Sequence, residues 1–145
     1  MLGCRAISWL GNGVFWYALM LALLLWRRDA ALAVLHMAGA GVACTVTYKL
    51  LKRGTLRPRP YQVQASIAQG ASVLDTFSFP SGHTLHAVAF SVVALAYYPS
   101  LAGLLVPFTL LTAVSRVVLG LHYPSDVLSG ATLGAVLGAA SLALV

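Results

Sequence analysis

His122 and Asp126, four positions apart, are ionisable residues in an otherwise apolar part of the sequence. A charged group among membrane-spanning residues costs about 2.5–3.5 kcal/mol on insertion scales unless it is paired or faces water, so such groups are candidates for function. Pro124 favours the first position of a helix, which places Asp126 in the first helical turn. From there its carboxylate can reach one ring nitrogen of His122 and leave the other free as a nucleophile. Taken alone, the pair is more simply explained as a polar cluster at a helix junction.

The sequence Pro80-Ser-Gly-His83 predicts a second helix start, one that can receive an anion. Ser81 is a favoured N-cap residue, and Gly82 lets an anion approach the exposed N–H groups of the new helix because it has no side chain. From the next position His83 can protonate a leaving-group oxygen as a general acid, a role typically worth about 10²–10⁴-fold in rate. Without His83, the stretch would indicate only the start of a helix.

Three cations complete the set of residues suited to phosphate chemistry. Lys52 offers a compact charge, and the planar fork of Arg59 grips two phosphate oxygens. Alone, these two are more simply the topology signal of a cytoplasmic loop. With Arg116, six residues before His122, they supply the charge compensation that phosphoryl transfer needs beside a nucleophile and a proton donor.

The composition places these residues in a membrane protein. Of the 145 residues, 60% are hydrophobic and 8% are charged, whereas about 25% are charged in soluble proteins. The net charge of +6 suits anionic lipid or a phosphate substrate. We expect no nucleic-acid partner, because a water-soluble reader of nucleic acid would not be so apolar. Cys4 and Cys44 indicate neither a disulfide framework nor a metal cluster.

Five apolar stretches have the length of membrane-spanning helices, which predicts an all-α membrane bundle. They cover residues 7–26, 30–51, 81–98, 101–121 and 125–145. The first is softly interrupted by Gly11-Asn-Gly13. In the last, Gly130, Gly134 and Gly138 recur at the spacing that lets transmembrane helices pack closely.

Residues 54–79 form the one substantial stretch outside the membrane, since Arg57-Pro-Arg-Pro60 cannot continue a helix. Apolar residues recur in it at helical spacing, which predicts a short amphipathic helix on the membrane surface. They are Val63, Ile67, Ala71 and Leu74. An irregular polar loop is the alternative. Asp75 is expected to be a solvated loop acid, with a salt bridge to one of the basic residues as the alternative.

Three blocks of the sequence together resemble the signature of the type 2 phosphatidic acid phosphatase family, membrane lipid phosphatases related to vanadium haloperoxidases. The blocks are Lys52-x6-Arg59-Pro60, Pro80-Ser-Gly-His83 and Ser115-Arg116-x5-His122-x3-Asp126. Their order and internal spacing match, and they span about half the chain. Three matching blocks are far more specific than one. Many membrane relatives have six spans, whereas five are predicted here, as though the first helix of the common pattern were missing.

The resemblance implies a role for each residue of the signature. His122 would attack phosphorus to form a phosphohistidine, Asp126 would orient it, and His83 would protonate the departing oxygen. The phosphoryl oxygens would be bound by Lys52, Arg59, Ser81, Gly82 and Arg116. The resemblance implies no metal or other cofactor, and the sequence has no carboxylate cluster of the kind that holds Mg²⁺.

We therefore expect residues 1–145 to form a single membrane-embedded domain that hydrolyses a lipid phosphate. Phosphatidic acid, phosphatidylglycerol phosphate and an isoprenoid diphosphate all present the same head to such a site. A vanadate-dependent haloperoxidase is one alternative, and a lipid-phosphate-binding or transport protein without catalysis is another. The expected partners are the lipid substrate and the bilayer, and the sequence carries no signal for an oligomeric state.

Five spans also determine which loops share a face of the membrane. The N-terminus, the 54–79 loop and the 120–125 turn fall on one face, so the basic loop and His122 meet there. The positive-inside rule favours a cytoplasmic position for this face. The family resemblance instead implies an outward-facing site in a bacterial inner membrane, which is the location we expect.

Overall fold

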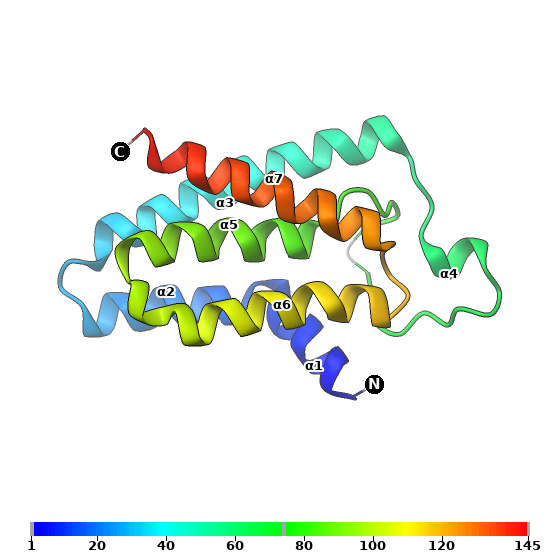
Figure 1. The fold of residues 1–145 in the computed structure, drawn as a ribbon, viewed down its shortest axis with the longest axis horizontal. Coiled ribbons are helices and arrows are strands. Elements are labelled where there is room, and N and C mark those ends of the chain that lie inside the picture. The colour runs from blue at the N-terminus through cyan, green and yellow to red at the C-terminus, as the bar shows by residue number, and fades with distance from the viewer. Residues whose placement is uncertain (1, 74, 145) are drawn as a thin grey trace.

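The structure is a computed structural model that describes residues 2–73 and 75–144. Over these residues it consists of helices joined by turns and loops, with no β-strand, which confirms the predicted all-α class (Figure 1). The elements in chain order are α1 (Leu2–Trp9), the π-helical turn η1 (Leu10–Val14), α2 (Phe15–Trp26), α3 (Ala30–Thr55), α4 (Pro60–Val63), α5 (Gly82–Tyr97), the 3₁₀ turn η2 (Pro99–Leu101), α6 (Ala102–Val118) and α7 (Pro124–Leu142).

The long apolar helices correspond to the predicted spans and differ from them by a few residues at their ends. Four stretches are long and apolar enough to cross a membrane: Leu2–Trp26, Ala30–Val63, Pro99–Val118 and Pro124–Leu142. The fifth, α5, has 16 residues, which makes it about 24 Å long. Leucine and valine side chains are exposed on the outer faces of α2, α3, α6 and α7, as expected of a surface that contacts lipid.

α5 lies at the centre of the bundle and packs against α3, α6 and α7 (Figure 1). The three glycines of α7 face it: Gly130, Gly134 and Gly138. A Cβ atom on Gly130 would lie 2.6 Å from the carbonyl oxygen of Ser81, and one on Gly134 would overlap the carbonyl oxygen of Leu85. The predicted small-residue packing is confirmed, and it brings the first turns of α5 and α7 together.

The first span bends sharply at η1. Gly13 has a φ of 118°, in a region that glycine adopts without a steric penalty. The helix therefore changes direction, and α1 packs against α6 (Figure 1). The soft interruption predicted at Gly11-Asn-Gly13 is a kink that turns the start of the chain across the end of the bundle.

The prediction of an amphipathic surface helix is wrong. α4 is a single turn over Pro60–Val63, and residues 64–73 are turns and loop. Leu74, the last residue of the predicted apolar stripe, lies outside the described residues.

The physical reason is that the loop packs on protein. The side chain of Ile67 lies over Gly120, where an added Cβ would be 2.5 Å from it. Gly70 donates its N–H to the carbonyl oxygen of Leu119 at 3.0 Å. Ile67 and Gly70 of the loop therefore pack on the turn between α6 and α7, and the helical spacing of the apolar residues does not produce a helix.

The two ends of the bundle carry different connections. The N-terminus, α4 with its loop and the α6–α7 turn lie at one end, and the α2–α3 turn, the α5–α6 turn and the C-terminus lie at the other (Figure 1). This agrees with the sidedness predicted from the count of spans. All three blocks of the signature therefore meet at one end.

We expect Gly134→Ala to destabilise the fold, because a methyl group there must push α7 away from the α5 backbone. Overpacking of this kind costs about 1–3 kcal/mol. Gly39→Ala is the matched control, since its Cβ would meet nothing within 4 Å and alanine favours a helix by about 1 kcal/mol. Thermal unfolding in detergent should show a lower Tm for Gly134→Ala alone. Equal Tm values for the two variants would contradict this packing.

Candidate functional site

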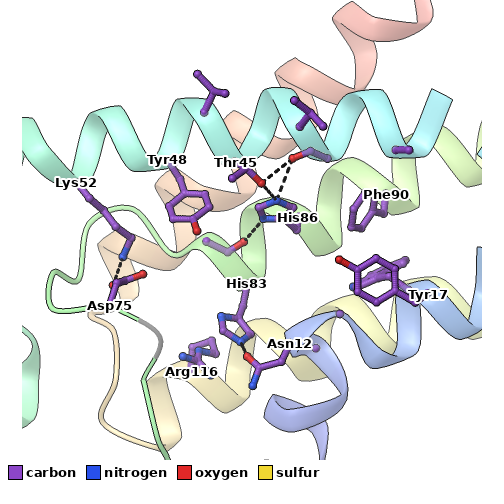
Figure 2. A pocket seen from close by; sticks show the side chains of 18 of the residues that line it. Asn12, Tyr17, Thr45, Tyr48, Lys52, Asp75, His83, His86, Phe90 and Arg116 are labelled. Carbon is purple, nitrogen blue, oxygen red and sulfur yellow. Dashed lines mark hydrogen bonds and ion pairs between the residues drawn. The ribbon is translucent and has the colours of Figure 1, made fainter. Parts of the chain in front are cut away.

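A cavity of about 550 Å³ lies at the end of the bundle that carries α4 and its loop (Figure 2). Six of the eight predicted site residues line it: Lys52, Arg59, Gly82, His83, Arg116 and His122. Ser81 and Asp126 are fully buried and are not part of its wall. The fold thus gathers side chains from α3, α5, α6 and two loops around one space.

Asp126 sits in the first turn of α7 with Pro124 at the first helical position, as predicted. One carboxylate oxygen accepts the N–H of Tyr123 at 2.8 Å, and the other accepts Arg57 Nη1 at 2.7 Å. The Nδ1 atom of His122 lies 3.8 Å from the carboxylate, which is beyond hydrogen-bond distance. The carboxylate therefore faces the imidazole as expected, while its two hydrogen bonds go elsewhere.

The other nitrogen of His122 is held by Arg59. Arg59 Nη1 lies 3.2 Å from His122 Nε2 and 2.8 Å from the carbonyl oxygen of Leu121. A guanidinium only donates, so Nε2 must accept and the ring proton must be on Nδ1, facing Asp126. This tautomer leaves the lone pair of Nε2 directed into the site.

The imidazole of His122 is neutral at pH 7. Its pKa is lowered to about 4, first by burial and then by the nearby cations, of which Arg59 and Arg116 act most strongly. The carboxylate of Asp126 acts in the opposite direction. A neutral imidazole is the form that can attack an electrophile.

Lys52 and Arg59 converge on one carboxylate, that of Asp75; Figure 2 shows its pair with Lys52. Its Oδ1 atom accepts Lys52 Nζ at 2.9 Å and Arg59 Nη2 at 2.8 Å. Both cations are almost completely buried. Asp75 is therefore not the solvated loop acid that was expected. It lines the cavity and supplies the anion between two predicted phosphate-binding groups.

The start of α5 is built as predicted except for its cap. Ser81 occupies the N-cap position, but its hydroxyl makes no capping bond and lies 3.0 Å from Thr84 Oγ1. Its N–H donates to the carbonyl oxygen of Asp126 at 3.0 Å, which ties the starts of α5 and α7 together. Gly82 faces the cavity, so the N–H end of the helix is open on that side.

His83 and Arg116 contact the first span, which sequence reasoning did not connect with the site. His83 Nε2 is hydrogen-bonded to Asn12 Oδ1 (Figure 2), and Arg116 Nη1 donates to Ser8 Oγ. Arg116 is 2% exposed, and its Nε has no partner among residues 2–73 and 75–144. One donor of a buried guanidinium is thus available for an anion.

Three residues that sequence reasoning missed are in direct contact with predicted ones: Ser8, Asn12 and Arg57. Asn12 carried a detectable signal, because it is the one asparagine of the chain and stands between two glycines within an apolar span. Arg57 was considered only as part of the Arg57-Pro-Arg-Pro60 stretch, and nothing local pairs it with a residue 69 positions away.

The cavity continues from the charged end into an apolar region between α2, α3 and α5. Its walls there are formed by aromatic and aliphatic side chains: Trp16, Tyr17, Met20, Val42, Val46 and Phe90. The site thus has one end suited to an anion and one suited to a hydrocarbon chain.

Residues 30–145 match the family model described as the PAP2 superfamily. The chain belongs to this family. It is similar in structure to two solved proteins. Against the PAP2-type phosphatidylglycerolphosphate phosphatase of Bacillus subtilis the TM-score is 0.76 at 26% identity, covering 97% of this chain and 74% of that one. Against Aquifex aeolicus LpxE it is 0.77 at 27% identity, covering 98% and 84%. With its apolar helices, the chain is an integral membrane protein.

Two curated relatives are similar in sequence. The decaprenylphosphoryl-5-phosphoribose phosphatase of Mycobacterium tuberculosis (strain ATCC 25618 / H37Rv) is 42% identical over 105 residues, which are 70% of this chain and 55% of the relative. The undecaprenyl-diphosphatase BcrC of Bacillus subtilis (strain 168) is 34% identical over 125 residues, which are 84% and 64%. The chain thus spans less than two thirds of the length of either.

We expect Asp75→Asn to bind an oxyanion more tightly than the unchanged protein, by about tenfold, because its carboxylate occupies the space between Lys52 and Arg59. Orthovanadate binding, measured by titration calorimetry in detergent, checks this. Asp29→Asn is the matched control, since Asp29 pairs with Arg27 at the opposite end. Weaker binding by Asp75→Asn would mean that the carboxylate holds the two cations in place for the anion and does not compete with it.

Proposed function

We propose that the protein is a membrane lipid phosphatase that hydrolyses a phosphate monoester or diphosphate through a phosphohistidine at His122. The observation that carries the proposal is the convergence of Lys52, Arg59, Arg116 and two histidines on one cavity with an apolar extension. Membership of the PAP2 superfamily supports the same reaction class. Residues 1–145 would act as a single domain.

The phosphoryl group binds at the charged end of the cavity. Lys52, Arg59 and Arg116 compensate its charge, and the open helix start at Gly82 offers backbone N–H groups. The phosphate takes the place of the Asp75 carboxylate between Lys52 and Arg59. As Arg59 turns to the phosphate it releases the lone pair of His122 Nε2, so substrate binding prepares the nucleophile.

Two chemical steps follow. Nε2 of His122 forms a bond to phosphorus while the bond to the lipid oxygen breaks, and His83 gives that oxygen a proton. The Nδ1–H of the phosphohistidine faces Asp126, whose carboxylate stabilises the positive charge of the ring. A water molecule then gives a proton to His83 and attacks phosphorus, which breaks the P–N bond and releases phosphate. The enzyme returns to its starting state with no metal or other cofactor taking part.

The proposed substrate class is a polyprenyl phosphate or diphosphate. The apolar region of the cavity is lined by Trp16, Tyr17, Met20 and Phe90 and can receive the part of an isoprenoid chain next to the phosphate. Two of the similar relatives are named for a decaprenyl and an undecaprenyl substrate. Phosphatidylglycerol phosphate, which the name of the similar Bacillus subtilis phosphatase suggests, is one alternative. Lipid A phosphate is another, suggested by the name of a Rhizobium johnstonii lipid A 1-phosphatase that is 30% identical over 118 residues, which are 75% of this chain and 48% of the relative.

We expect the purified protein to release phosphate from a polyprenyl diphosphate in detergent, with EDTA present, and His122→Ala to lower the rate by at least about 10³-fold. His36→Gln is the control, since His36 contacts Tyr97 and Ser141 outside the cavity. A ³²P-labelled substrate should leave an acid-labile label on the protein that is lost in His122→Ala.

Two outcomes would favour the other functions. Binding of polyprenyl phosphates without any His122-dependent phosphate release would indicate a carrier. Oxidation of halide by the vanadate-loaded protein would indicate a haloperoxidase.

The proposed location is the inner membrane of a bacterium, with the site facing outward. Several cations of the site end are engaged in the structure: Arg5 donates to the carbonyl oxygen of Gly70 at 2.7 Å, and Arg57 pairs with Asp126. Discounting them leaves Lys49 and Arg53 at this end, and discounting Arg27, which pairs with Asp29, leaves Arg28 at the other. The difference is one charge, so the positive-inside rule gives little preference.

In a Cys4→Ser background, we expect Gln64→Cys to react with an impermeant maleimide in intact cells and Arg28→Cys to react only after permeabilisation. Gln64 is exposed in the loop after α4, and Arg28 in the turn between α2 and α3. The reverse labelling pattern would place the site in the cytoplasm.

A further inference from the structure

The first span contributes to the site although the family match begins only at residue 30. Asn12, in η1, lines the cavity and accepts a hydrogen bond from Nε2 of His83. Ser8, one turn earlier, accepts one from Arg116. Two of the cavity's functional side chains are thus held by a segment to which the family signature assigns nothing.

The backbone of η1 is shaped to place Asn12 there. Gly11 packs closely on α6 and α5, since an added Cβ would lie 3.2 Å from Thr112 Cγ2 and 3.7 Å from His83 Cδ2. Gly13 provides the positive φ that bends the chain. The two glycines bring the backbone to the cavity, and the residue between them presents a polar side chain to His83.

We propose that Asn12 is a positioning residue for His83, which keeps a proton on Nε2 and so makes Nδ1 the nitrogen that exchanges the catalytic proton. The inference rests on the proposed function, in which His83 is the general acid. A carbonyl oxygen on one ring nitrogen selects the tautomer and fixes the plane of the ring. In the substrate complex His83 carries a proton on both nitrogens; it gives the Nδ1 proton to the leaving oxygen, becomes neutral with its remaining proton on Nε2, and recovers the Nδ1 proton from the attacking water.

The other groups around His83 cannot take this role. They are Arg116 of α6, His86 one turn further along α5, and Arg59 and His122 from the loops. The two arginines only donate hydrogen bonds. The ring nitrogens of His86 contact the carbonyl oxygen of Gly82, at 2.8 Å, and the hydroxyl of Thr45. Nε2 of His122 contacts Arg59. Among the described residues, Asn12 is the acceptor that His83 Nε2 has.

Steady-state kinetics on the polyprenyl substrate test the proposal. We expect Asn12→Leu to lower kcat by about 10–100-fold, as loss of an outer hydrogen-bond partner does, with KM changed little. Asn12→Asp keeps the acceptor oxygen and should retain kcat within a few-fold while raising KM, because its charge repels phosphate. Trp9→Leu, an exposed position of the same segment, should match the unchanged protein. Equal loss of kcat in the leucine and aspartate variants would overturn the proposal.

A measurement without substrate separates this inference from the proposed function. In ¹⁵N-histidine-labelled protein, long-range ¹H–¹⁵N correlation spectra identify the tautomer of each ring. We expect His83 to carry its proton on Nε2 in the unchanged protein and to become a mixture in Asn12→Leu, with the other three histidines unaffected. A proton on Nδ1 of His83, or the same tautomer in both proteins, would overturn the role of Asn12 even if the lipid phosphatase activity is found.

Discussion

The structure depends on three cations buried at one end of an apolar bundle. Arg59 and Arg116 are each 2% exposed and Lys52 is 5% exposed, so each has lost most of its hydration. A buried charge is tolerated when it is paired and hydrogen-bonded. Here the compensation comes from the Asp75 carboxylate, the Phe77 and Leu121 carbonyls and the Ser8 hydroxyl. The loops that carry these acceptors are therefore held by charge, although they have little regular secondary structure.

The same compensation explains how the site can be ready for an anion. Each of these acceptors is a weaker partner than a phosphate dianion, because a hydroxyl, a carbonyl or a single carboxylate offers less charge. The hydrogen bonds and ion pairs of the cations are thus sufficient for the fold to form. They are weak enough for a more highly charged anion to replace them. In the proposed mechanism Arg59 links this exchange to the attack on phosphorus, since it contacts both Asp75 and the lone pair of His122.

Helix packing determines the distance between the two histidines. His83 follows the first residue of α5, and His122 precedes α7 by two positions. The glycines of α7 let it lie against the α5 backbone, and the N–H of Ser81 bonds to the carbonyl oxygen of Asp126. A proton donor and a nucleophile on opposite sides of a phosphoryl group need such a rigid spacing. The chemistry at the loops thus rests on contacts within the hydrocarbon part of the bundle.

Much of this protein could be predicted from its sequence, because the deciding signals are local. Hydropathy located the five apolar helices, Pro124 and Ser81 marked the helix starts, and the spacing of the signature picked out six residues that line the cavity. The same reasoning failed for residues 64–73, where helical spacing was misleading because Ile67 and Gly70 pack on the α6–α7 turn.

What only the tertiary structure decided are the pairings between distant segments: Asp75 with two cations, Arg57 with Asp126, and Asn12 with His83. The physical reason is that hydropathy and helix capping act over a few residues along the chain. The partner of a buried polar group is chosen instead by which helices pack together, and no local pattern records that choice.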